Sequence, residues 1–200
     1  VGGLKRMGYA GAQVSGVHTA DGARRLLDLV GALDADLPTL ATADREVLAV
    51  AAYHVGRMDR AAELAPEGSE VAVWTAFAAE DHALALRRAA RLDKATRSAP
   101  MEAAIGWAQW RAGQAVAARQ SIARAVALDA ADPTVAQVAA ALALTDGRPA
   151  LARDTLAGLL ARLPQLPWSA WFNLGIAQLQ LGDPAAAHAS TAAWFPHERT

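Results

Sequence analysis

Residues 167–196 read PWSAWFNLGIAQLQLGDPAAAHASTAAWFP, two alanine-rich apolar runs separated by Gly182-Asp183-Pro184. Glycine ends a helix readily because it adopts the left-handed backbone conformation at little cost. Aspartate caps the helix that follows, and proline suits its first position, where an N–H would find no partner. The stretch therefore predicts two helices joined by a tight turn. One such hairpin cannot bury its apolar face alone, so we expect it to recur.

The turn glycine recurs at Gly113 and Gly147, so that the three turns stand 34 and 35 residues apart. Small residues also keep fixed distances from each turn, seven positions before it and five after it. These pairs are Gly106 with Ala118, Ala140 with Ala152, and Gly175 with Ala187. Residues without bulk at both places let paired helices approach closely. The period and the paired small residues predict an array of helix hairpins.

These repeats resemble the tetratricopeptide-repeat (TPR) family. The resemblance is carried by Trp171-Phe172-Asn173-Leu174-Gly175 with Gly182 and Ala187, by Ala125-Val126-Ala127-Leu128-Asp129, and by Pro164. It implies an all-α fold, an α-solenoid of antiparallel helix hairpins that forms a TPR-like superhelix. We expect the repeat domain to cover 41–200, with degenerate repeats at 41–66 and 67–98 and clear ones at 99–132, 133–167 and 168–200.

The helix ends follow from caps and breakers. We expect first helices at 43–55, 70–79, 101–112, 133–145 and 168–181, and second helices at 59–64, 82–92, 114–128, 149–163 and 184–195. In the second repeat Glu80 occupies the place of the turn glycine. The register there comes from Trp74-x-x-Phe77, which returns 33 residues later as Trp107-x-x-Trp110.

Residues 1–40 are expected to form a separate part, a glycine-rich arm leading into one helix. The run at 12–17 also fits a short strand. The stretch RMGYAGAQVSGVHT at 6–19 resembles the end of a TIM-barrel reductase of the methylenetetrahydrofolate type. On that interpretation, residues 1–40 are the remnant of an upstream domain.

The composition argues against several classes of function. The net charge of −1 and the pI of about 6.6 give no electrostatic footprint for nucleic acid or for an anionic membrane. The absence of cysteine excludes disulfides, a thiol nucleophile and a cysteine-based zinc site, and it fits a cytoplasmic location. No apolar run is long enough to predict a membrane span.

The sequence offers no catalytic constellation. No two histidines have the spacing of a zinc-binding helix, and no nucleophile-elbow motif is present. Glu80-Asp81-His82 coincides with a helix start, where the helix dipole favours acids, so we interpret it as a cap. The arginines of the second helices, Arg87, Arg88, Arg91, Arg119 and Arg124, are interpreted as solvated outer faces. We expect no enzyme activity, no metal and no cofactor.

The aromatic residues carry the functional prediction. In the family that the chain resembles, the first helices line a concave face. Carried over by register, this gives a partner-binding groove lined by Tyr53, Trp74, Phe77, Trp107, Trp110, Arg111, Gln137, Leu144, Phe172 and Ile176. For any single tryptophan, packing between repeats is an equal alternative. The repeated aromatic pair favours an exposed strip, which is typical of partner sites. The family's clamp for a C-terminal carboxylate is not expected, because Ala103 and Trp107 hold its lysine and asparagine places.

We therefore expect a non-enzymatic scaffold that binds a peptide or protein segment in this groove, with no nucleic acid partner. The alternative is an accessory or regulatory arm of a larger enzyme or transcription regulator whose other part precedes Val1. From Leu163 onward the only formal charges are Asp183, Glu198 and Arg199. A nearly uncharged terminal repeat needs cover. We expect further sequence, a partner or a second copy of the chain to cover it, the last by self-association through the C-terminal repeat.

Overall fold

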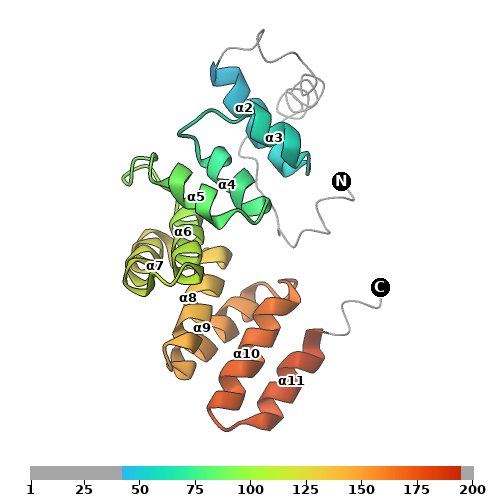
Figure 1. Cartoon of the computed structure of the whole chain (residues 1–200). Coiled ribbons are helices and arrows are strands. Elements are labelled where there is room, and N and C mark those ends of the chain that lie inside the picture. Colours follow the sequence, from blue (N-terminus) through green and yellow to red (C-terminus); the bar gives the residue numbers. More distant parts are fainter. Residues whose placement is uncertain (1–41, 195–200) are drawn as a thin grey trace. The chain divides into compact units, whose positions relative to one another are not determined.

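A computed structural model describes residues 42–194, and within that range it holds ten α-helices and no strand. The helices follow one another as antiparallel pairs (Figure 1). They are α2 (Thr42–His54), α3 (Met58–Leu64), α4 (Glu70–Ala78), α5 (His82–Ala89), α6 (Ala99–Arg111), α7 (Ala115–Asp129), α8 (Pro133–Thr145), α9 (Pro149–Arg162), α10 (Trp168–Gln180) and α11 (Pro184–Trp194). The predicted all-α architecture of helix hairpins is confirmed. The strand at 12–17, the helix before residue 41 and the reductase-like stretch lie outside the described residues.

The chain divides after Arg97 into two compact units. The described part of unit 1 contains α2 to α5, and that of unit 2 contains α6 to α11. The core of unit 1 joins α2 and α3 to the start of α4, with Tyr53 packed against it. This cluster consists of Leu48, Ala49, Ala51, Ala52, Ala61, Leu64 and Val71. The prediction of one repeat domain over 41–200 stays a prediction.

Each hairpin turn places one residue in the left-handed backbone region. Glycine takes this conformation in four of the five described turns, at Gly56, Gly113, Gly147 and Gly182. Glu80 takes it in the turn between α4 and α5, with φ at 58°. Because a side chain makes this conformation costly, Glu80 is held there by the hairpin rather than by its own preference. The register that assigned Glu80 to the glycine's place is confirmed.

The small residues mark the points where paired helices cross. A Cβ atom added to Gly175 on α10 would lie 3.5 Å from the carbonyl oxygen of Ala187 on α11 and 3.1 Å from Cγ2 of Thr191. A Cβ atom on Gly106 would lie 3.2 Å from the carbonyl oxygen of Ala118. The predicted close approach of paired helices is thus confirmed in the hairpins α6–α7 and α10–α11.

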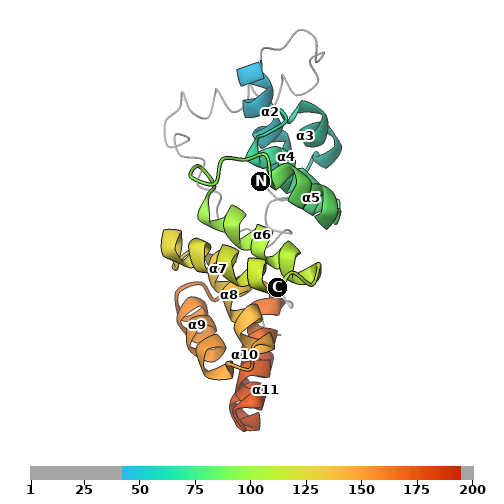
Figure 2. The same cartoon turned by 60° about the vertical axis from the view of Figure 1, so that its left-hand side comes forward.

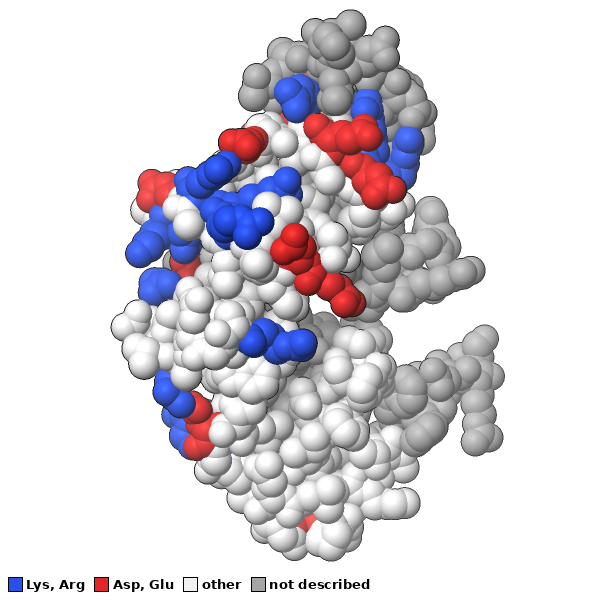
Figure 3. All heavy atoms as spheres, in the orientation of Figure 1, with Lys and Arg blue, Asp and Glu red and all other residues white. Residues whose placement is uncertain are grey.

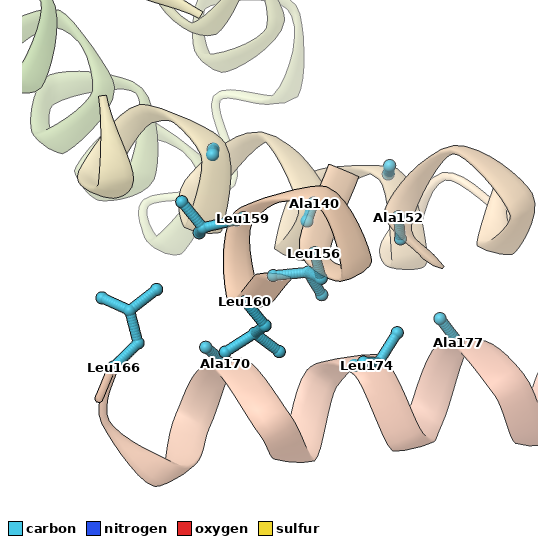
Figure 4. Close-up of a cluster of buried hydrophobic side chains, with 11 residues drawn as sticks. Ala140, Ala152, Leu156, Leu159, Leu160, Leu166, Ala170, Leu174 and Ala177 are labelled. Atoms are coloured by element: carbon cyan, nitrogen blue, oxygen red, sulfur yellow. The ribbon is translucent and has the colours of Figure 1, made fainter. Parts of the chain in front are cut away.

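Helix α8 is central to unit 2 because it buries two faces. Val135 and Leu142 join residues of α6 and α7 in one cluster. Ala136, Ala140 and Ala143 join residues of α9 and α10 in another. In that second cluster, Ala170, Leu174 and Ala177 of α10 lie along the side of the helix that faces Leu156 and Leu160 of α9 (Figure 4). These contacts identify the side of α10 that faces the core.

The interpretation of the second-helix arginines as solvated is wrong for Arg88, which is half-buried, whereas Arg119 and Arg124 are exposed and also form ion pairs. Arg88 on α5 donates to the carbonyl oxygen of Ala72 on α4 at 2.6 Å. Arg124 on α7 forms an ion pair of 3.0 Å with Glu102 on α6, a side chain that is only 1% exposed. Figure 2 shows these two helices side by side. Arg119 on α7 pairs with Asp146 at the end of α8. Their long side chains reach across the hairpins to acceptors that a single helix does not reveal.

Candidate protein-interaction surface

The ten predicted groove residues divide between the two units. Tyr53, Trp74 and Phe77 belong to unit 1, and the other seven belong to unit 2. In unit 1, Trp74 and Phe77 lie with ring centroids 5.8 Å apart, and Phe77 lies 6.2 Å from the ring of His82. Tyr53 packs against the α2–α3 core. A single groove that runs over both units stays a prediction.

The aromatic pair of α6 is stacked and partly buried. The rings of Trp107 and Trp110 have centroids 5.0 Å apart and an interplanar angle of 26°. Trp110 packs against the cluster that α6 and α7 share with α8. Trp110 therefore packs, at least in part, between repeats, which is the alternative that the sequence left open for any single tryptophan. Arg111 beside the pair is exposed.

The two predicted residues of α8 also serve the helix packing. Leu144 packs against the cluster of α8, α9 and α10. The side-chain amide of Gln137 donates to the carbonyl oxygen of Pro133 in its own helix at 3.1 Å. Both residues are half-buried. Less of their surface is accessible to a partner than their positions in the repeat suggest.

Among the side chains that the structure describes in unit 2, the most exposed aromatic ones lie on α10. Trp168 is 54% exposed, Phe172 48% and Leu179 58%. Phe172 is two residues from Ala170 and from Leu174, which face the core, so it projects from the opposite side of the helix. At 100° per residue these side chains and Ile176 fall within an arc of about 80°. We call Trp168, Phe172, Ile176 and Leu179 the end stripe.

Of the four end-stripe residues, Phe172 and Ile176 were predicted groove residues, the register also placed Leu179 on the groove face, and Trp168 was not predicted. The rings of Trp168 and Phe172 contact each other with centroids 5.5 Å apart. Their spacing of four residues is the signal that was available, because residues four apart are neighbours on a helix face. The register likewise assigns Leu179 to the same place as Trp110.

Comparison with α6 explains why the end stripe is exposed. The corresponding register positions of α6 are Ala99, Ala103, Trp107 and Trp110. Ala103 is fully buried, in a cluster that includes Val135 and Leu142 of the next first helix, α8. In α6 this side of the helix is therefore covered by another helix. In α10 it is open within the part of the chain that the structure describes.

Charge is nearly absent around the end stripe. Between Trp168 and Trp194 the only formally charged residue is Asp183. Its carboxylate caps α11 by accepting a hydrogen bond from the backbone N–H of Ala186 at 2.9 Å. On the face shown in Figure 3, the surface over α10 and α11 at the bottom of the view is almost free of charged side chains. A partner here meets an apolar and electrically neutral surface.

The other candidate chemistry has a structural explanation. Asp81 accepts a hydrogen bond from the backbone N–H of Leu84 at 2.8 Å, so the Glu80-Asp81-His82 cluster is a helix cap, as predicted. Residues 42–194 contain no group of three or more metal-ligating side chains. None of the helices that the structure describes is long and apolar enough to cross a membrane.

Comparison with known proteins shows a likeness of fold. The sequence matches no protein-family model. No curated protein matches it either. A chain in the crystal structure of the APC/C hetero-tetramer Cut9–Hcn1 superposes with a TM-score of 0.63 at 17% sequence identity. The likeness covers 87% of this chain and 36% of that one, so this chain spans about a third of the length of the solved protein.

Proposed function

Because the chain has the tetratricopeptide-repeat fold, we propose that it is a protein-interaction scaffold whose unit 2 binds a peptide or protein segment through apolar side chains of its first helices. The observation that carries the proposal is the end stripe. A contiguous patch of exposed apolar side chains often marks an interaction site on a protein surface. The end stripe on α10 includes an aromatic pair, and aromatic side chains are the commonest binding hot spots.

The binding surface extends from the end stripe to the neighbouring first helices. Helix α8 contacts both α6 and α10, so the three first helices are neighbours within unit 2. Trp107 and Leu144 add apolar surface that is only half-buried, and Arg111 and Gln137 add a polar edge. In unit 1, Trp74 and Phe77 form another aromatic pair, and Tyr53 is a further half-buried aromatic side chain. Apolar anchors with a polar rim are the usual anatomy of such interfaces.

Site-specific photo-crosslinking tests the proposal. A benzophenone side chain at position 172 should capture a binding protein from cells, whereas the same group at position 116 should not. Val116 on α7 is a matched control because it is 70% exposed in the same unit and lies outside the end stripe. The captured protein is then purified and its affinity for the chain is measured by calorimetry.

The affinity measurement decides the outcome. Phe172→Ala should weaken binding by about 2 kcal/mol or more, the usual effect of removing a hot-spot side chain. Val116→Ala should leave the affinity unchanged. At concentrations where the chain is monomeric, both variants should melt at the temperature of the wild type, since both side chains are largely exposed. Equal affinities for Phe172→Ala and the wild type would reject the surface.

A further inference from the structure

We infer that the occupant of the end stripe is a second copy of this chain, so that two chains pair about a two-fold axis through their α10 helices. This names the partner of the proposed surface and rests on the proposed function. Three observations on unit 2 support it: the register that the stripe occupies, the lack of charge around it, and the small side chains beside it.

The end stripe occupies repeat positions that another helix covers elsewhere in unit 2. On α6 the same positions are covered by α8, whose Val135 and Leu142 share a cluster with Ala99 and Ala103. The stripe on α10 has larger side chains in these positions, with Trp168 and Phe172 in place of the two alanines. A second α10 that lies across the stripe would cover it helix against helix, as α8 covers α6, but it would run in the opposite direction.

The charge distribution favours an identical partner. A two-fold axis brings the same patch of both chains together, so any charge on the patch would be buried against the same charge of the other chain. Burying an unpaired charge is costly. Asp183, the one formal charge between Trp168 and Trp194, lies in the turn between α10 and α11 and caps α11. The stripe therefore meets its own copy without repulsion, and apolar interfaces of this sort are typical of homodimers.

The positions of the stripe residues along α10 determine which side chains meet in the pair. A two-fold axis perpendicular to α10 makes the two helices antiparallel. Trp168 then lies near Leu179 of the partner subunit, and Phe172 lies close to the axis. Three exposed side chains of the adjacent α11, those of Ala185, Ala189 and Ala192, are too small to hold the second helix away, and the exposed His188 is the larger one among them.

Sedimentation of the intact chain and of charge variants tests this pairing. The wild type should sediment as a dimer. Phe172→Glu should raise the dissociation constant by at least about 100-fold, because two like charges meet near the axis. Phe172→Lys should do the same. An equimolar mixture of Phe172→Glu and Phe172→Lys should dimerise at least about 10-fold more tightly than either alone, because opposite charges then meet.

Controls separate the pairing from loss of fold. Val116→Glu places the same charge on an exposed site outside the stripe and should remain dimeric. Helical circular dichroism of each variant verifies folding. If Phe172 variants fail to fold, the pair Trp168→Lys and Leu179→Glu replaces them, since both side chains are more exposed than Phe172. The mixture of these two variants should again associate more tightly than either alone.

Each outcome decides the inference. A wild-type chain that remains monomeric at high concentration would overturn it, as would a dimer that Phe172→Glu leaves intact or a mixture without recovery. The proposed function fails separately. If the chain is monomeric but position 172 still captures a different protein whose affinity depends on Phe172, the interaction surface stands and only its occupant is wrong. If neither self-association nor capture depends on Phe172, both fail.

Discussion

Arg119 on α7 and Asp146 at the end of α8 form a two-pronged ion pair across 27 residues of sequence. Nε of Arg119 donates to Oδ2 of Asp146 at 2.9 Å, and Nη2 donates to Oδ1 at 2.6 Å. The hydrogen bond from Arg119 holds the pKa of the Asp146 carboxyl below its usual range, with a smaller contribution from the charge of Arg148. The same carboxylate raises the pKa of Arg119. The pair ties one hairpin to the turn of the next.

Asp146→Asn should lower the melting temperature modestly at neutral pH and not at all in strong acid. The folded pKa of Asp146 lies below its unfolded value of about 3.9. The pair therefore adds stability at pH values above about 4, and this contribution is lost as the pH falls through the folded pKa. Melting curves of both proteins from neutral to acid pH measure the gap. A gap that stayed constant into strong acid, or that resisted high salt, would contradict the assignment.

Arg124→Met should be clearly destabilising, although Arg124 is half-exposed. It removes the cation beside Glu102, whose charge is buried in the α6–α7 hairpin. The expected loss is about 2 kcal/mol or more of unfolding free energy in urea. Arg153→Met is the control, because Arg153 pairs only with its exposed neighbour Asp154 and should change stability by less than about 0.5 kcal/mol. Adding Glu102→Gln to Arg124→Met should recover part of the loss.

Glu80→Gly should stabilise unit 1. Glu80 is the one non-glycine residue with a left-handed backbone among residues 42–194. Removing its side chain relieves a strain of about 1 kcal/mol, partly offset by the greater freedom of glycine when unfolded. The reverse change at the equivalent turn, Gly147→Ala, should cost about 1 kcal/mol. Thermal melts of both variants test the pair, and shifts of the same sign would show that backbone conformation does not govern these turns.

Gly175→Leu should destabilise the last hairpin. The added side chain would press on Thr191 and on the backbone of Ala187, and overpacking of this kind costs about 1–3 kcal/mol. Gly158→Leu on α9 is a matched control, since a Cβ atom there has no neighbour within 4 Å. It should be neutral or gain up to about 1 kcal/mol, because leucine favours a helix more than glycine does. Equal losses for both variants would disprove the close approach at Gly175.

Trp110→Ala and Phe172→Ala should separate packing from binding. Trp110 packs against the α6–α7–α8 cluster, so its loss should cost about 2–3 kcal/mol of stability, somewhat less than the usual cost at a fully buried site. In the single chain Phe172 is exposed, and its loss should cost less than about 0.5 kcal/mol. Unfolding in urea at several protein concentrations gives both values. A larger loss for Phe172 that does not change with protein concentration would show that the end stripe belongs to the core, because a loss caused by weaker pairing of two chains depends on concentration.

Much of the fold could be predicted because its signals are local. The caps and prolines gave the bounds of α8 without error, and the turn glycines set the register of the hairpins. The observed helix ends differ from the predicted ones where a side chain that was not expected to do so caps the helix. Helix α5 ends at Ala89, not at Leu92, as Arg97 donates to the carbonyl oxygens of Ala89 and Leu92 and satisfies the end of the helix. Helix α6 begins at Ala99 because Ser98 caps it.

The interaction surface was harder to predict, because register identifies equivalent positions without showing which of them are covered. Trp110 and Leu179 occupy the same place in their repeats. Trp110 packs against the cluster that includes α8, whereas Leu179 has no such helix beyond it among the described residues. The partners of Arg119 and Arg124 were unpredictable for a similar reason, since each acceptor lies on another helix more than twenty residues away.

The two buried faces of α8 have a consequence for how unit 2 folds and opens. The two apolar clusters described above depend on this helix, whereas α11 packs mainly against α10. Contacts that join elements close in sequence keep the contact order low, which favours rapid folding. Local opening should then proceed from the helix with the fewest buried neighbours. In a hydrogen-exchange experiment the amides of α11 should exchange first within the unit, and those of α8 last.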